Sequence, residues 1–515
     1  MNLSQLTVKL SDAKHPAFWA PFAVFCVLLL LCPNCRPYSG DEIHAMVMAR
    51  GSVGETLAAV AADARPPAYF LLVKAVCAVA GERLWALRLL SAVFAMAAFP
   101  FLWVLSRRFF GKSVAIPAWL LATSAFTVFA SRFACHYSLG LLETAVATWL
   151  LLLLLERPTR GLWIAYGALL TLSLYTFTLS IITLIAHLVA FAVARRSDPR
   201  RLIPPLLAIA IPCLLFAPWA GAMGGAAARI GAAPESAGFG GRATGAATQI
   251  AYALYAFALS DSISPFALPF SAIAAAFLAF LAVLGARRMW RSLSWRSSVV
   301  PAMVGVALVL PALMRLGGLM REPAIFLPVR LLFVTPFFMM ILACGVLAIG
   351  NRRVRYAALV AVIALQAVSL FNHYLNRQWT NWAYVVPMAE IVAQVEKNVH
   401  PDDLVILDEW NLGDGPSYYW HGKAWVYRFG PSATRWPARL QSARRVWVVR
   451  AVRDQSPGVQ TDRLLLQIKL NFVLKQQWVY VKEPPVIYEW KRRLLRREVF
   501  PHKVETLFFE RPTEG

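Results

Sequence analysis

Long apolar runs separated by short basic loops are the feature that most limits what this 515-residue chain can fold into. Many of the runs approach the roughly 20 residues that a helix needs to cross the hydrocarbon of a bilayer. Only helices and closed barrels satisfy the backbone in lipid, and these runs lack the alternation of barrel strands. They therefore predict membrane-spanning helices, and the composition agrees, since 59% of the residues are hydrophobic and only 15% are charged.

Basic clusters predict which ends of these helices face the cytoplasm. Although the formal net charge is +24, most arginines lie in short clusters between apolar runs, so the charge reflects topology and predicts no nucleic-acid partner. The clusters occupy residues 107–112, 157–160, 195–201, 287–296 and 352–355. All of them face the cytoplasm if the N-terminus is cytoplasmic and the chain crosses the membrane about eleven times. The spans are then expected to begin near residues 17, 84, 113, 138, 161, 179, 202, 265, 299, 331 and 357.

This span count leaves three long segments on the outer face, namely residues 33–83, residues 223–264 and everything after residue 372. It requires residues 67–81 not to cross the membrane. That stretch is short, begins with prolines and contains Lys74, as expected of an interfacial helix. The middle segment is rich in glycine and alanine, and it is predicted to be a mobile loop or a linker.

Beyond residue 372 the apolar runs shorten to the length of strands, at residues 403–409, 423–429 and 444–451. Short buried strands that alternate with helical stretches predict a small α/β domain. We therefore expect a polytopic α-helical membrane domain over residues 1–372, with the outer loop 33–83, and a soluble α/β domain on the outer face over residues 373–515.

The first outer loop combines acidic and basic residues next to the membrane. Asp41 and Glu42 follow the first span closely, so they are expected at the depth of lipid headgroups, where a carboxylate can take a proton from an acceptor hydroxyl. Arg65, Lys74 and Arg88 lie in the same loop or at the start of the next span, where cations would stabilise a departing phosphate. The alternative for each cation is simple contact with lipid headgroups.

The order of motifs in this region resembles the first loop of GT-C glycosyltransferases, in particular family 39, which includes protein mannosyltransferases, and the related aminoarabinose transferases. The motifs are Asp41-Glu42, PPAYF at residues 66–70, RLLSA at residues 88–92 and RRFFG at residues 107–111, and the similarity covers about the first 180 residues. The resemblance implies a GT-C fold and an inverting sugar transfer. It also implies that Asp41 is the catalytic carboxylate and that Arg65 approaches the carrier phosphate. Glu42, the neighbour of Asp41, is the alternative assignment for the carboxylate. Tyr69, within the second motif, is a further expected substrate contact.

A later turn, SRFACHYSLG at residues 131–140, resembles the turn between the third and fourth spans of that family. Its polar residues Arg132, His136 and Tyr137 are candidate substrate contacts. Phe133 and Cys135 stand where the family usually has an acid and an arginine, so this turn lacks a second carboxylate.

Two residues farther along complete the candidate set. Glu143, in the fourth span, is a candidate for the missing second carboxylate, and the alternative is that it is a hydrogen-bonded packing residue. Arg330, before a late span, is a candidate contact to phosphate or sugar, and the alternative is an interface anchor.

The resemblance predicts an enzyme of the bacterial inner membrane that uses a polyprenyl-phosphate-linked sugar and an envelope lipid, glycan or protein as acceptor. No phosphate-binding loop, dinucleotide fingerprint or HExxH motif is present, which argues against an ATP-driven pump and a zincin. No metal site is assigned, and the single Asp-Glu pair leaves the use of a divalent cation open. A non-enzymatic flippase or transporter of lipid-linked sugars is the alternative function.

Overall fold

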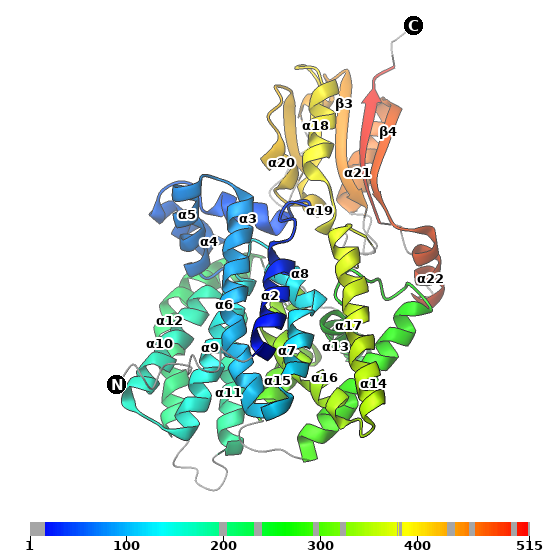
Figure 1. Ribbon diagram of the computed structural model, residues 1–515. Coiled ribbons are helices and arrows are strands. Elements are labelled where there is room, and N and C mark those ends of the chain that lie inside the picture. The colour runs from blue at the N-terminus through cyan, green and yellow to red at the C-terminus, as the bar shows by residue number, and fades with distance from the viewer. Residues whose placement is uncertain are drawn as a thin grey trace. The chain divides into compact units, whose positions relative to one another are not determined.

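The computed structural model divides into two compact units (Figure 1). The helical unit comprises Met1–Pro33, Met48–Asp261 and Ile273–His373, and the C-terminal unit comprises Asn34–Val47, Ser262–Ala272 and Tyr374–Gly515. The residues that the structure describes are 16–194, 203–230, 239–291, 298–319, 326–377, 380, 384–429, 438–452, 459–495 and 502–512.

The described part of the helical unit is built from helices. Seven of them are long and apolar enough to cross a membrane, and they confirm the predicted helical multi-pass membrane protein. The long helices are α6 (Leu84–Phe110), α9 (Tyr137–Glu156), α12 (Ile203–Ile230), α14 (Phe270–Arg291), α15 (Val299–Leu316), η6 with α16 (Pro328–Val334 and Thr335–Ala348) and α17 (Arg352–Tyr374).

The remaining predicted spans correspond to shorter helices. They are α2 (Pro16–Leu30), α7 (Ala115–Ala122) with α8 (Ala125–Ser131), α10 (Arg160–Thr176), and η3 (Thr178–Ser180) with α11 (Ile181–Ala194). Between α7 and α8 the helix is interrupted at Ser124, whose hydroxyl caps α8 by accepting a hydrogen bond from the Thr127 amide at 3.3 Å. Because a helix rises only about 1.5 Å per residue, each of these pieces is short for a full crossing.

The helices present apolar side chains outward, as lipid-facing helices do. Leu214 on α12 and Ile164 on α10 are 73% and 72% exposed. Inside the unit, α14 and α16 approach each other through glycines. A methyl group on Gly285 would lie 2.0 Å from the Ile341 carbonyl oxygen, and one on Gly345 would lie 2.0 Å from that of Leu281. Small residues thus bring these two backbones together, as is common between helices in membranes.

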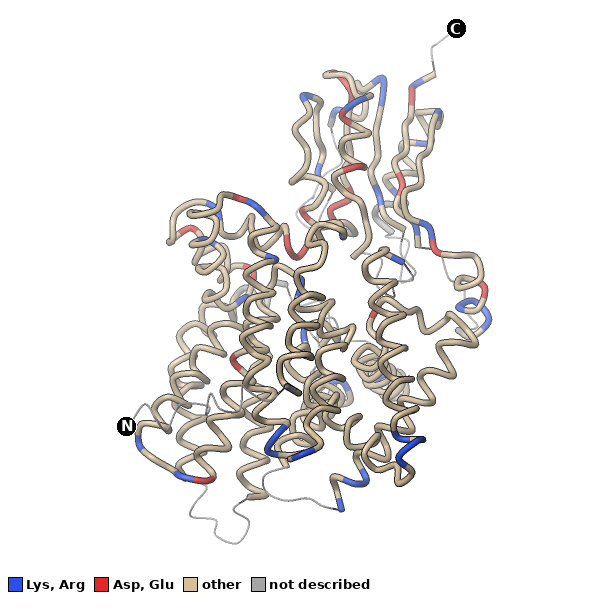
Figure 2. The backbone as a smooth tube through the Cα atoms, in the orientation of Figure 1, with Lys and Arg blue, Asp and Glu red and all other residues tan. Residues whose placement is uncertain are grey.

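The basic clusters gather at one end of the helical unit. Figure 2 shows Lys and Arg at the ends of α6 and α14, after α9 and at the start of α17, all at the same end. There an ion pair of 3.4 Å joins Arg108 on α6 to Glu156 on α9. The predicted topology requires this arrangement, because all basic clusters can face the cytoplasm only if they lie at one end of the unit. The predicted cluster at residues 195–201 and part of the one at 287–296 lie outside the described residues.

The prediction of a loop or linker over residues 223–264 is wrong for most of that segment. Helix α12 continues to Ile230, and α13 spans Phe239–Leu259. Buried Ala253, Ala256 and Phe257 recur at helical spacing in α13. The glycines and alanines that resemble a linker in sequence instead allow close packing against α15, where Arg315 Nη1 donates a hydrogen bond to the Gly245 carbonyl at 3.1 Å.

Three short helices occupy the first outer loop, namely α3 (Gly40–Met48), α4 (Val53–Ala62) and α5 (Ala68–Ala80). Helix α5 covers the stretch that was predicted not to cross, and its 13 residues are too few to span a bilayer. Helix α4 begins with a capping box, in which the side chains of Ser52 and Glu55 each bond to the other residue's amide.

The C-terminal unit contains the predicted α/β domain. Its mixed five-stranded sheet has the order β2-β1-β3-β5-β4. Strands β1, β2 and β3 are parallel, and β5 is antiparallel to both of its neighbours, β3 and β4. The predicted strands correspond to β1 (Leu404–Asp408), β2 (Trp425–Phe429) and β3 (Arg445–Val452). The other elements are α18 (Met388–Asn398), α19 (Glu409–Leu412), α20 (Gly415–Tyr419), η8 (Ala438–Leu440), α21 (Val459–Asn471), β4 (Val473–Lys482), α22 (Pro485–Leu495) and β5 (Lys503–Glu510).

The core of this sheet domain lies between the strands and α21. Ile406 and Val448, which pair in register across β1 and β3, pack there with Leu464, Ile468 and Phe509. Strand β4 was not predicted, because it lies at the edge of the sheet and is largely exposed, so its sequence is polar in its first half.

Candidate functional site

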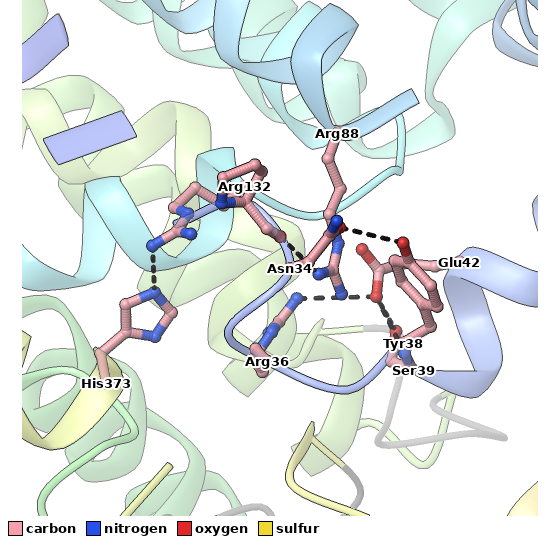
Figure 3. A network of polar contacts seen from close by, with 9 residues as sticks. Asn34, Arg36, Tyr38, Ser39, Glu42, Arg88, Arg132 and His373 are labelled. Atoms are coloured by element: carbon pink, nitrogen blue, oxygen red, sulfur yellow. Dashed lines mark hydrogen bonds and ion pairs between the residues drawn. The ribbon is translucent and has the colours of Figure 1, made fainter. Parts of the chain in front are cut away.

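Glu42, at the start of α3, is fully buried and caps its own helix. Its Oε2 accepts hydrogen bonds from the Ser39 amide at 2.8 Å and the Ser39 hydroxyl at 3.2 Å, and it lies 3.6 Å from Arg36 Nη2 (Figure 3). An acid in the first turn that bonds back to the preceding amide is half of a capping box. The Glu42 carboxylate is therefore occupied by contacts that hold α3.

Asp41 lies next to Glu42 but in a different environment. Its side chain is only partly buried. Its carboxylate makes no hydrogen bond or ion pair with any residue that the structure describes. A carboxylate with unused lone pairs can accept a proton or a hydrogen bond from a substrate. Of the two predicted acids, Asp41 is thus the one whose oxygens are available for chemistry.

Two predicted cations bind the backbone that directly follows α2. Arg88 Nη1 donates a hydrogen bond to the Pro33 carbonyl at 2.8 Å, and Arg132 Nη2 donates one to the Cys32 carbonyl at 2.5 Å. Arg132 also lies 3.2 Å from His373 Nε2, as Figure 3 shows. Both arginines are buried, at 3% and 5% exposure, so these contacts fix the path of the chain as it leaves the first helix.

His136, at the start of α9, lies among aromatic rings. Its ring centroid is 4.3 Å from that of Phe177, 4.7 Å from that of Tyr137 and 6.0 Å from that of Tyr69. Its Nε2 is buried and has no hydrogen-bond partner among the described residues. Three of the predicted contacts, Tyr69, His136 and Tyr137, are therefore neighbours in space.

Positive charges surround this histidine. Burial, followed by the charges of Arg65 and Arg330, holds the pKa of His136 well below its usual value, so the imidazole is neutral at physiological pH. The structure thereby brings Arg65 and Arg330 within electrostatic range of one residue, although they are far apart in sequence. Two cations and an imidazole nitrogen with no partner suit an anionic group that also forms a hydrogen bond.

Arg65 and Lys74 also have protein contacts of their own. Arg65 Nε lies 2.5 Å from Asp63 Oδ2, and the Arg65 carbonyl accepts a hydrogen bond from Trp219 Nε1 at 3.0 Å. The Lys74 ammonium donates to the Ala49 carbonyl at 3.3 Å and to the Gly51 carbonyl. Lys74 therefore holds the turn between α3 and α4.

Glu143 is buried on α9 and contacts α10. Its Oε1 accepts a hydrogen bond from the Thr176 hydroxyl at 2.8 Å, whereas its Oε2 has no partner among the described residues. The hydrogen bond to Thr176 agrees with a packing role for Glu143. The Oε2 atom without a partner agrees with a functional role, because it could bind a substrate.

Sequence reasoning missed two titratable residues. Asp261, after α13, is 1% exposed, accepts a hydrogen bond from the Tyr252 hydroxyl at 2.8 Å, and has its pKa raised by burial to about 6. A lone acid at the end of an apolar run was the available signal. His44, on α3, has its Nδ1 2.7 Å from Asp414 Oδ2. No local signal could have indicated that pair, because its partners are distant in sequence.

The described residues do not form a metal centre. Among them, no three or more His, Cys, Asp or Glu side chains group as ligands. Glu42, the acid closest in sequence to Asp41, is occupied by Ser39 and Arg36. A divalent cation that prefers several oxygen ligands does not fit this pair.

Comparison with known proteins matches residues 64–221 to the family described as dolichyl-phosphate-mannose-protein mannosyltransferase. The matched stretch includes Arg65, Arg88, Arg132, His136 and Glu143, and it begins after Asp41. No curated protein matches the chain by sequence.

Two solved structures share the fold. ArnT from Cupriavidus metallidurans, in the apo state, has 13% sequence identity and a TM-score of 0.53, and the match covers 95% of this chain and 97% of that one. The oligosaccharyltransferase of Archaeoglobus fulgidus, in complex with Zn and sulfate, has 13% identity and a TM-score of 0.51, over 84% of this chain and 68% of that one. The two structures show that the chain shares their fold, and the family model confirms the predicted resemblance to protein mannosyltransferases over residues 64–221.

Proposed function

We propose that this protein is a GT-C glycosyltransferase that moves a sugar from a polyprenyl-phosphate carrier to an envelope lipid, glycan or protein on the outer face of the bacterial inner membrane. The matching family is named for enzymes that use a sugar linked to dolichyl phosphate, which supports a donor of the same chemical class. The observation that carries the proposal is the contrast between Asp41, with no partner among the described residues, and the capping residue Glu42.

In the proposed reaction Asp41 takes the proton of the acceptor nucleophile. The nucleophile then attacks the anomeric carbon opposite the phosphate, the bond between that carbon and the phosphate oxygen breaks, and the configuration inverts. Arg65 and Arg330 stabilise the charge that grows on the departing carrier phosphate, and His136 Nε2 donates or accepts a hydrogen bond there. A carrier phosphate is already a good leaving group, so the reaction needs no acid to protonate it.

The test compares Asp41→Asn with Glu42→Gln in cells that lack the native gene. A base contributes about 10²- to 10⁴-fold, so Asp41→Asn should reduce the rate of product formation by that factor. Glu42→Gln should chiefly lower the melting temperature of the purified protein, because the variant loses the charge that caps α3 and faces Arg36. Mass spectrometry of envelope glycolipids and glycoproteins, normalised to folded protein in the membrane, measures the product.

Two results would contradict the proposal in different ways. If Asp41→Asn forms product at the wild-type rate, Asp41 is not the base, and Glu143 is the next acid to test. If even the wild type forms no glycosylated product from any polyprenyl-phosphate-linked sugar, the chain is not a transferase, and transport of the lipid-linked sugar becomes the reading to test.

A further inference from the structure

We infer that the C-terminal unit positions the catalytic carboxylate, with Asp414 acting through His44 on α3. The inference rests on the proposed role of Asp41 as the base. It assigns Asp414 and His44 as positioning residues, and it gives the sheet domain a direct part in transfer.

Helix α3 belongs structurally to the C-terminal unit. Residues Asn34–Val47 group with Tyr374–Gly515, although some 330 residues separate them in the sequence. The helix has only 9 residues, and a helix of this length is marginal by itself. Its orientation, and with it the direction of the Asp41 side chain, must therefore be set by what it packs against.

The residues that join α19 to α20, from Leu412 to Gly415, contact one face of α3. At the first residue, a methyl group on Gly40 would lie 3.4 Å from the Leu412 carbonyl oxygen, so the two backbones are almost in contact. One turn later, Ile43 is fully buried, and its Cδ1 lies 3.9 Å from where a methyl group on Gly415 would be.

The same segment supplies a polar contact at the next residue. His44 Nδ1 lies 2.7 Å from Asp414 Oδ2. Residues 40, 43 and 44 follow the helical spacing of one face, so Leu412, Asp414 and Gly415 contact a single side of α3.

These contacts restrict rotation of α3 about its axis. Asp41 follows Gly40 directly and lies one turn before His44, so a rotation that breaks the His44 contact also displaces the Asp41 carboxylate. Displacement of a catalytic group by about 1 Å can cost on the order of 10²-fold in rate. The two carboxylates therefore have different roles, because Asp414 fixes the orientation of α3 and Asp41 accepts the proton.

We expect the protein to stay folded when the His44–Asp414 pair is removed. The side chains are 21% and 39% exposed, and pairs of this exposure contribute at most about 1 kcal/mol to stability. Asp414→Ala and His44→Ala should each lower the rate of transfer at saturating donor by about tenfold. The donor concentration that gives half of the maximal rate should not change, because neither residue belongs to the proposed phosphate contacts.

Two further variants serve as rescue and control. Asp414→Asn keeps an oxygen that accepts a hydrogen bond from His44, so it should recover most of the activity that Asp414→Ala loses. Lys475→Ala removes an exposed ion pair of the same unit, at 3.9 Å from Glu510, and should transfer at the wild-type rate. Wild-type activity in Asp414→Ala would overturn the inference.

A double variant separates positioning from a general structural role. If Asp414 acts only through Asp41, Asp41→Asn combined with Asp414→Ala should be no slower than Asp41→Asn alone. An additional tenfold loss in the double variant would show that Asp414 acts independently of Asp41. Failure of the proposed function would look different, because Asp41→Asn by itself would then be fully active.

Discussion

At the scale of single residues, local packing separates acids that look equivalent in the sequence. Glu42 is fully buried and bonded to Ser39, whereas Asp41 is partly exposed and has no partner among the described residues. The same principle applies to Asp261, whose burial favours the neutral acid. Its only polar contact that the structure describes is the Tyr252 hydroxyl.

Asp261 leads to a prediction about pH. Its pKa is about 6 in the folded protein, against an ordinary value of 3.8. The stability that the neutral, buried acid contributes is complete below about pH 4 and is lost as the pH rises through 6. Asp261→Asn should avoid this loss, which is about 3 kcal/mol for a shift of this size. Its melting temperature should match that of the wild type near pH 4 and exceed it by several degrees at pH 8.

The measurement is thermal unfolding in detergent at one heating rate across this pH range. Asp402→Asn provides the control, because it makes the same substitution at an exposed acid. A difference between Asp261→Asn and the wild type that does not depend on pH would mean that the buried carboxyl does not titrate in this range.

At the scale of elements, close helix contacts depend on glycines at specific positions. Glycines in α13 resembled a linker in the sequence, yet Gly245 lies against Arg315 of α15. On α14 and α16, Gly285 and Gly345 each lie beside a backbone carbonyl of the other helix. A glycine in a membrane helix therefore has to be interpreted from what lies opposite it.

This contact predicts a difference between two glycine substitutions. Gly345→Ala would place a methyl group 2.0 Å from the Leu281 carbonyl oxygen, so the helices must separate, and overpacking of this kind costs about 1 to 3 kcal/mol. Gly167→Ala on α10 meets nothing within 4 Å and should be neutral or slightly stabilising. Melting temperatures of the two variants in detergent measure the difference, and equal values would show that α14 and α16 do not pack this closely.

At the scale of the whole molecule, charge and hydropathy are arranged for a membrane. The described basic clusters lie at one end of the helical unit, and the outward surfaces of α10 and α12 are apolar. The positive-inside rule predicts that this basic end faces the cytoplasm and that the chain leaving the other end of α17 lies on the outer face.

This orientation can be tested with reporter fusions. Fusions after Lys112 and after Arg355 should report the cytoplasm, whereas a fusion after Gly515 should report the outer face. Each position can be fused both to a reporter that is active only in the cytoplasm and to one that is active only outside it. The two reporters at one position control each other, because only one of them should be active. A C-terminus on the cytoplasmic side would place the sheet domain, with α3 and Asp41, on the wrong side for a lipid-linked donor on the outer face.

Local patterns were sufficient to predict the class of this protein. Apolar runs of membrane length predicted its helices, and short apolar runs predicted β1, β2 and β3. The order of four motifs between Asp41 and residue 111 resembles that of glycosyltransferases. Each apolar run is a continuous stretch of sequence, so its length and composition already limit the backbone.

Only the tertiary structure decided the roles of individual side chains. It paired His44 with Asp414, brought Arg330 near His136, and turned the glycine-rich segment before Asp261 into a helix. These features depend on burial and on partners that are distant in the sequence, and neither can be derived from the local sequence. The sequence therefore indicated which acids to consider, and packing determined that Glu42 caps a helix while Asp41 keeps its oxygens available.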